Sequence, residues 1–170
     1  MKNGPGFKHC GFRVSLWVAI LLAIAYPVAA AYALPGLTIE RVALRMTQPE
    51  VVKVKGEPAK RRVFKKDQSE RWEYVGNITV LFRPVRGQSR VCGIAGNSLE
   101  KDGELICKVQ DNLGGVLFRC NQLGHCQEQE NQDYSGELRY YQVTDSLNGN
   151  LFLIFRNLKL YSISIDLPEP

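Results

Sequence analysis

Short apolar stripes at helical spacing occur at two places in the chain, and residues that favour helix ends bound the first of them. Thr47 is a good N-cap, and Glu50, three residues later, can reach back to the backbone N–H of the cap. Gly56 can adopt the left-handed conformation that closes a helix, and Pro58 prevents its continuation. The pattern predicts a helix over 48–55, which at about two turns is stable only when packed against other elements.

Alternating apolar and polar positions follow this helix and predict three strands. Trp72 and Tyr74 would share one face of a strand, as would Val80 and Phe82 of the next strand. This period of two residues predicts a sheet with one buried face. The predicted strands cover 70–75, 78–83 and 90–95.

The same order of elements then appears a second time. A helix cap, a short apolar helix and a closing glycine recur over 111–124, and a polar loop follows over 125–137. The offset between the two copies is nearly constant, and it is 66 residues from Tyr74 to Tyr140. Three more strands are predicted over 138–143, 150–155 and 159–165.

One short helix covers a three-stranded sheet poorly, so the two copies should share a core. We therefore predict an α+β fold with two tandem helix–β-meander repeats, at about 45–96 and 110–165. The repeats would share one antiparallel sheet, with the short helices packed on one of its faces. A polar segment over 96–104 would link them.

Several of these motifs resemble the repeat of a known family. The resemblance rests on the stretches MTQPEVVKVKGEP, RWEYV, ITVLF and VCGIAG, and it covers about 45–165. They are similar to the repeat shared by the SmpA/OmlA (BamE) outer-membrane proteins and the β-lactamase-inhibitor-protein-like domains. Met46 and Thr47 match the residues that open the helix of that repeat, and Gly56 and Pro58 match those that close it. The resemblance implies an α+β layer structure and a protein-binding role at the cell envelope.

An apolar segment precedes the predicted domain. Residues 1–33 begin with a basic stretch, continue with twenty uncharged residues over 14–33 and end in an A-x-A pattern at Ala31 and Ala33. This order is typical of a secretory signal peptide. An uncleaved membrane anchor is the alternative, because about twenty apolar residues can span a bilayer. Both interpretations predict export to the periplasm or an equivalent lumen, where 34–170 would form a single domain, and the second adds membrane association.

Charge is distributed unevenly along the chain. Residues 53–90 contain 11 basic and 4 acidic residues, or +7, whereas residues 97–137 contain 3 basic and 8 acidic residues, or −5. The basic residues cluster in a predicted loop, but export and the lack of a nucleic-acid-binding motif argue against a nucleic acid partner. An acidic protein face or an anionic membrane surface fits better. The expected partner-binding residues are Lys60, Arg61, Arg62, Lys65, Lys66, Trp72 and Tyr74.

Four cysteines follow residue 33, and an even number in an exported chain suggests disulfides. Three pairings are possible, and we favour Cys92–Cys107 with Cys120–Cys126 because both pairs close short loops. A metal site made of Cys107, Cys120, His125 and Cys126 is the alternative, although this spacing does not match a common zinc pattern. We expect no metal and no cofactor.

The chain carries no recognised catalytic motif, since it lacks G-x-S-x-G, H-E-x-x-H and a P-loop. We therefore expect a non-enzymatic protein-binding module. It would act in envelope protein assembly or as an inhibitor or accessory subunit of a membrane-associated complex, with another envelope protein as its partner. The alternative is a small-ligand carrier or an enzyme that uses an aromatic pocket formed by Trp72, Tyr74, Tyr140 and Tyr141.

Overall fold

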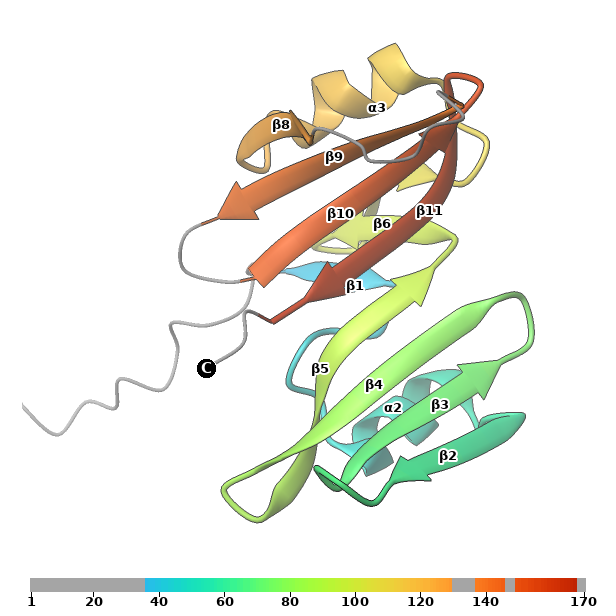
Figure 1. The fold of residues 1–170 in the computed structure, drawn as a ribbon, viewed down its shortest axis with the longest axis vertical. Coiled ribbons are helices and arrows are strands. Elements are labelled where there is room, and N and C mark those ends of the chain that lie inside the picture. The colour runs from blue at the N-terminus through green and yellow to red at the C-terminus, as the bar shows by residue number, and fades with distance from the viewer. Residues whose placement is uncertain (1–35, 130–136, 146–148, 168–170) are drawn as a thin grey trace, which may run out of the picture. The chain divides into compact units, whose positions relative to one another are not determined.

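A computed structural model describes residues 36–129, 137–145 and 149–167, which all lie in one compact unit of the chain (Figure 1). The helices in these residues are α2 (Gln48–Lys55) and α3 (Leu113–Cys120). The strands are β1 (Leu37–Ile39), β2 (Lys60–Phe64), β3 (Ser69–Tyr74), β4 (Ile78–Val85), β5 (Gln88–Gly96), β6 (Ser98–Lys101), β7 (Glu104–Lys108), β8 (His125–Gln129), β9 (Leu138–Asp145), β10 (Gly149–Arg156) and β11 (Lys159–Asp166). The predicted signal peptide or anchor, 1–33, lies outside the described residues.

The expected α+β class was wrong, because the fold is mostly β. Strands account for 59% of the described structure and helices for 13%. Two antiparallel sheets are present instead of one sheet covered by short helices. The physical reason is that the predicted basic loop forms β2, the polar loop contributes β8, and the predicted linker forms β6 and the first residue of β7. These segments satisfy their backbone hydrogen bonds in ladders, although few of their side chains are apolar.

The larger sheet has eight strands in the order β2-β3-β4-β5-β11-β10-β9-β8, and all its neighbours are antiparallel. Each helix is followed by four strands that form a meander, β2–β5 after α2 and β8–β11 after α3. The two meanders join where β5 pairs with β11, with Ile94 opposite Ile165. The repeated order of elements is thus visible in the topology, with one more strand in each copy than the sequence indicated.

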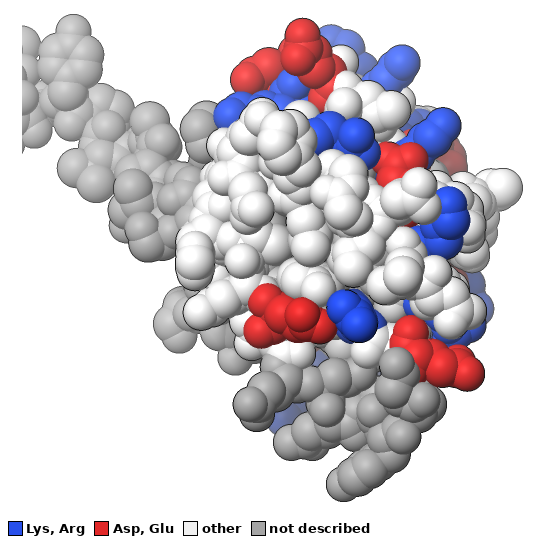
Figure 2. All heavy atoms as spheres, turned by 90° about the horizontal axis from the view of Figure 1, so that it is seen from above, with Lys and Arg blue, Asp and Glu red and all other residues white. Residues whose placement is uncertain are grey.

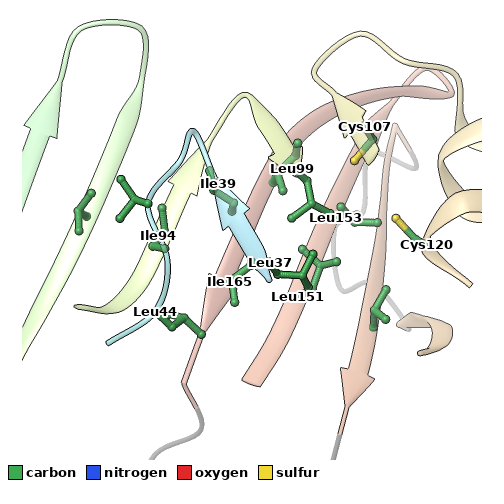
Figure 3. Close-up of a cluster of buried hydrophobic side chains, with 14 of the residues drawn as sticks. Leu37, Ile39, Leu44, Ile94, Leu99, Cys107, Cys120, Leu151, Leu153 and Ile165 are labelled. Atoms are coloured by element: carbon green, nitrogen blue, oxygen red, sulfur yellow. The ribbon is translucent and has the colours of Figure 1, made fainter. Parts of the chain in front are cut away.

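The smaller sheet has three strands in the order β1-β6-β7 and helps to bury one face of the larger sheet. Figure 3 shows Leu37 and Ile39 of β1 lying close to Leu151, Ile165 and Ile94 of the larger sheet. All five side chains are buried. The hydrophobic core therefore lies between two sheets, and α2 and α3 extend the layer that the smaller sheet forms.

The predicted bounds and cap of α2 are confirmed. The carboxylate of Glu50 accepts the backbone N–H of Thr47 at 2.7 Å and its hydroxyl at 2.8 Å. These two hydrogen bonds lower the pKa of Glu50. Gly56 ends the helix with φ 78° and ψ −168°, so it has the expected positive φ but an extended rather than a left-handed helical ψ. Val51 is the fully buried residue of this helix.

The ends of α3 differ from the expected ones. Asn112 rather than Asp111 is the N-cap, and the carboxylate of Asp111 lies 3.0 Å from Nη2 of Arg119. The helix ends at Cys120, before the glycine that was expected to close it. Gly124 instead allows a close approach, since a Cβ there would lie 3.2 Å from the backbone oxygen of Thr144.

Candidate partner-binding face

The basic residues that were expected in a loop lie on an edge strand and in the turn after it. β2 is at one end of the eight-stranded sheet, so one side of its backbone has no strand neighbour among the described residues. Lys60, Arg61 and Arg62 belong to β2, Lys65 and Lys66 belong to the turn before β3, and all five side chains are exposed. We call these five residues the basic edge.

Neighbouring acids neutralise only part of the charge on the basic edge. Arg61 forms an ion pair with Glu57, and Nε of Arg62 lies 3.7 Å from Oε1 of Glu73. Both pairs are largely exposed, and such pairs contribute little to stability. Within the described part of the chain no ion pair involves the three lysines of the edge, Lys60, Lys65 and Lys66. Their charge is therefore available to a partner.

Side chains of the basic edge point to both faces of the sheet. Arg61 is opposite Trp72 in the β2–β3 register, and its guanidinium carbon lies 4.4 Å from the centroid of the Trp72 ring system. Because successive side chains alternate along a strand, Lys60, Arg62 and Phe64 point to the opposite face. The Phe64 side chain is 46% exposed. Two basic side chains and one exposed ring thus border the face that Trp72 does not occupy.

The two aromatic residues that were expected to contact a partner serve mainly the interior of the protein. Trp72 is 1% exposed, its ring centroid lies 4.5 Å from that of Phe82, and its indole N–H donates to Glu70. Trp72 is therefore a core residue that is not placed to touch a partner. Tyr74 is half-buried, and its hydroxyl donates to the backbone oxygen of Gly56 at 3.4 Å. Burial raises the pKa of Tyr74, and its main contact ties the end of α2 to the sheet.

The opposite face of the eight-stranded sheet is not covered by any described helix or strand. In Figure 1 this face points to the viewer, while α2, β1 and β6 lie behind the sheet. Many of the residues that alternate with the buried ones and point to it are half-buried and uncharged, whereas Arg71, Glu73 and Arg83 on the same side are charged. We call the uncharged set the front face, and it consists of Thr79, Leu81, Ala95, Tyr140, Gln142, Phe152, Ile154, Ser162 and Ser164.

The front face is low in its middle and higher on both sides. Ala95 and Ser164 are directly opposite each other where the two meanders join. Larger side chains flank this pair, with Leu81 on one side and Phe152 and Ile154 on the other. Small residues between large ones form a shallow surface that a protein partner can cover, and the apolar side chains would be desolvated on contact.

Asp166 borders the front face at the end of β11. A Cβ added to Gly93, which is opposite Asp166 in the register, would clash with the Asp166 carboxylate. Burial raises the pKa of Asp166, and the charge of Arg83 acts in the other direction. The carboxylate is therefore a partly desolvated charge beside an uncharged surface.

The turn that carries Lys65 and Lys66 is held by its own side chains. The carboxylate of Asp67 accepts the hydroxyl of Ser69 at 2.8 Å and its backbone N–H at 3.1 Å. These hydrogen bonds lower the pKa of Asp67. Because the turn is closed by local hydrogen bonds, its two lysines are presented at a defined place beside β2.

The four cysteines are free thiols in this structure, so neither expected disulfide is present in it. Cys92 lies on β5 and is half-buried, with Arg83 and Asp166 among its charged neighbours. The structure does not bring Cys92 to Cys107. It brings Cys107 together with Cys120, which are both buried, and leaves Cys126 half-buried on β8.

No group of three or more histidine, cysteine or acidic side chains is arranged to hold a metal ion in the part of the chain that the structure describes. The cysteines considered as ligands therefore do not form a site together with His125 there. No helix among residues 36–129, 137–145 and 149–167 is long and apolar enough to cross a membrane. The apolar segment 14–33 lies outside these residues.

The tyrosines and the tryptophan considered for an aromatic pocket lie in different parts of the sheet. β3, which carries Trp72, and β9, which carries Tyr141, are separated by four strands. At a strand spacing of about 4.8 Å this is a distance of about 24 Å. Tyr141 is buried, packs edge-to-face on Phe155 and donates its hydroxyl to Glu128 at 2.9 Å. These residues therefore do not line one pocket.

A second uncharged area lies at the end of the molecule that carries α3. Figure 2 shows this end from above, with a broad area free of charged side chains in the middle of the view. Phe118 of α3 is 72% exposed, and Leu158, whose backbone oxygen accepts the N–H of Leu113, is 56% exposed. The area offers apolar contact but no charge that would select a partner, so the front face with its basic edge is the stronger candidate.

Comparison with known proteins finds no matching family model, no matching curated protein and no matching solved structure.

Sequence reasoning located the basic edge and a sheet with only one buried face, but it did not identify the residues of the front face or Phe64. The pattern of β10, in which Leu151, Leu153 and Phe155 are buried, contains the signal that could have found the face. Phe152 and Ile154 alternate with these residues, so an apolar strand that is buried on one side also has large apolar groups on the other.

Proposed function

We propose that this chain is an exported, non-enzymatic protein-binding module whose front face holds a partner that carries an acidic patch. The observation that carries the proposal is the basic edge. Five exposed basic residues lie together at one edge of a sheet face whose middle is uncharged and half-buried, and three of them have no ion pair in the described structure. The proposal of export rests on the pattern of residues 1–33, and the resemblance to envelope proteins supports an envelope or membrane-complex protein as the partner.

Binding would use the two parts of the surface in different ways. The unpaired lysines would attract an acidic patch over a distance of about one Debye length, roughly 8–10 Å, and so raise the association rate. The front face would then bury its apolar side chains, such as Leu81 and Phe152, and supply most of the affinity. Ser162 and Ser164 would offer hydroxyl groups for hydrogen bonds in the same contact.

The orientation of the partner would follow from the one-sided placement of charge. The basic edge lies at the β2 end of the sheet, while the other end is formed by β8, whose side chains include Glu128. An acidic patch would therefore be placed over β2 and β3. A partner bound the other way round would place its acids over β8, which contains no lysine or arginine.

The experiment that tests this proposal reverses the unpaired charge of the basic edge. The test variant changes three exposed lysines without ion pairs to glutamate, namely Lys60, Lys65 and Lys66. Arg61 is kept, because it covers Trp72 and its loss would disturb the fold. The control variant makes the same change in net charge at three exposed lysines away from the edge, Lys53, Lys108 and Lys159.

Immobilised wild-type protein should retain a specific protein from an extract of its native envelope. The association rate of that protein is then measured with the wild type, the test variant and the control variant. We expect the test variant to associate about tenfold more slowly at low salt, while the control variant stays near the wild-type rate. High salt should reduce the difference, because screening weakens exposed charges. Equal losses in both variants would mean that net charge alone matters and would contradict the proposal, as would a rate that ignores both variants.

A further inference from the structure

Two cysteines from different elements meet in the hydrophobic core. Cys107 lies on β7 and Cys120 is the last residue of α3, and the side chains of both are fully buried. α3 packs against β7, and the Cys107 thiol is the neighbouring group that most raises the pKa of the Cys120 thiol. Figure 3 shows both sulfur atoms directed into the space between β7 and α3.

We propose that Cys107 and Cys120 form a disulfide that ties α3 to the smaller sheet. Both side chains project into the same buried space between β7 and α3, so the sulfurs can approach each other without a large movement of the backbone. The bond would close the chain between two elements that are otherwise joined by a short connection, by apolar packing and by the Asp111 carboxylate, which accepts from the N–H of Lys108 and from Arg119. This inference does not depend on the proposed partner.

The other cysteines have less suitable positions. Cys92 is directed towards Arg83 and Asp166, whereas Cys107 lies in the core with Cys120. Cys126 has Cys120 among its electrostatic neighbours but is half-buried on β8, and it is Cys107 rather than Cys126 that raises the pKa of Cys120. The sequence favoured pairs that close short loops, but contact across the core favours Cys107 with Cys120.

The chemistry of the step is thiol–disulfide exchange with a low-molecular-weight disulfide such as oxidised glutathione. The Cys120 thiolate attacks one glutathione sulfur, forms a mixed disulfide and releases one glutathione thiolate. The Cys107 thiolate then attacks the Cys120 sulfur, forms the protein disulfide and releases the second glutathione thiolate. Two protein thiols are oxidised and one disulfide of glutathione is reduced to two thiols, so protons and electrons balance.

The bond should form during folding and not in the finished structure. Contact with Cys107 and burial raise the pKa of the Cys120 thiol, which keeps it protonated at neutral pH. A protonated thiol without access to solvent does not attack a disulfide. Oxidant must therefore reach both residues before α3 packs against β7, and the completed bond should then be protected from reductants.

The test is to refold the full chain in a buffer of reduced and oxidised glutathione and to map its disulfides by mass spectrometry without reduction. We expect a Cys107–Cys120 link in the wild type and in the control variant Cys92→Ser. Cys92 and Cys126 should react with an alkylating reagent after unfolding, whereas Cys107 and Cys120 should not. Reduction should lower the thermal midpoint by roughly 5–15 °C, the range expected for a loop of about 15 residues.

Three results would overturn the inference. They are a Cys120–Cys126 link, a Cys92–Cys107 link, and alkylation of Cys107 and Cys120 as free thiols after oxidative refolding. The variant Cys126→Ser tests whether Cys126 competes with Cys107 for Cys120. It should keep the Cys107–Cys120 link at wild-type yield, and a link that forms only in this variant would assign Cys126 as the partner of Cys120 in the wild type. Mapping of the wild type needs no variant to fold, so the test gives an answer in each case.

Discussion

Replacement of Gly56 by alanine should isolate the free energy of backbone strain at the end of α2. Gly56 has φ 78° and ψ −168°, a combination that is almost confined to glycine because a Cβ meets the neighbouring backbone. The space around the residue is open, since an added Cβ would meet no other atom within 4 Å. The methyl group would therefore neither clash with another part of the protein nor gain packing, and only the local backbone would be strained.

The expected cost follows from these two observations. A residue held in such a region costs about 1–3 kcal/mol, so Gly56→Ala should lower the free energy of unfolding by about this amount. Part of the strain can be relieved if the backbone rotates, but the N–H of Gly56 donates to the oxygen of Val52 at 2.8 Å and Tyr74 donates to the oxygen of Gly56. Rotation would disturb both hydrogen bonds, so relaxation also has a cost.

Gly114→Ala is the matched control. Gly114 lies in the first turn of α3, has no positive φ, and an added Cβ there would also meet nothing within 4 Å. Alanine favours a helix over glycine by about 0.5–1 kcal/mol, so this variant should be more stable than the wild type. The same change from glycine to alanine should therefore lower the free energy of unfolding at Gly56 and raise it at Gly114, although both positions are equally open.

Urea unfolding followed by circular dichroism measures both effects, provided that the slope of the transition is unchanged. The reasoning would be refuted if Gly56→Ala lost less than about 0.5 kcal/mol, because a residue with this φ and ψ cannot accept a Cβ so cheaply. It would also fail if both variants changed stability in the same direction. The backbone conformation at Gly56 would then not be the reason that glycine ends α2.

Three further predictions concern side chains. Thr47→Ala should lower the free energy of unfolding by about 1 kcal/mol, because the helix loses its cap, and an unchanged urea midpoint would contradict this. Because the pKa of Glu50 is lowered, its carboxylate stabilises the fold at pH values above the ordinary pKa of 4.5, and this contribution is lost as the pH falls through the pKa of the folded state. In Glu50→Gln the free energy of unfolding should therefore depend less on pH in the acid range. Burial raises the pKa of Asp166 above 3.8, so Asp166→Asn should be more stable than the wild type at pH 7 but not at pH 3, and equal stability at both values would exclude this cost.

Elements that carry their own local signals were predictable. The bounds of α2 follow from Thr47, Glu50 and Gly56, which act within one turn of the chain. β4 and β10 follow from a strict alternation of buried and half-buried positions. In these segments the local preference and the final packing agree, so they can be predicted without knowledge of the rest of the fold.

Elements without an apolar side were missed. Every side chain of β2 is exposed, so its sequence shows no alternation and reads as a basic loop. It is a strand because β3 offers a backbone ladder along its whole length. β6 and β7 did carry a signal, since Asp102 and Gly103 are a typical hairpin turn between residues that alternate, but the charged surroundings suggested a linker.

The fold class was wrong because local patterns do not say what covers a sheet. β1 and β6 are about sixty residues apart in sequence, and their pairing creates the layer that buries Ile94 and Ile165. Two helices of eight residues each cannot cover eight strands. The prediction of one sheet covered by helices took no account of a second sheet. Contacts at such separation depend on the whole chain and leave no periodic trace.

The candidate site was predictable in its charge but not in its shape. Clustering of basic residues in the sequence survives folding, because the chain keeps them within one strand and one turn. Which face each residue serves depends on the register, and the register places Arg61 over Trp72 and turns Lys60 and Arg62 to the side of the sheet that carries the front face. Cys92 is the unpaired residue of a bulge in the β4–β5 ladder, so alternation alone could not place its side chain.

Basic residues on an edge strand have a second possible role, which is to prevent two copies of the protein from pairing edge to edge. This role and partner binding make different demands on the sign of the charge. Like charges repel whether they are positive or negative, so a strand protected by lysines is equally protected by glutamates. A partner with an acidic patch, in contrast, accepts only positive charge. The variant with glutamate at Lys60, Lys65 and Lys66 should therefore remain monomeric and soluble, and a loss of association by this monomeric variant would assign the basic edge to recognition and not to protection alone.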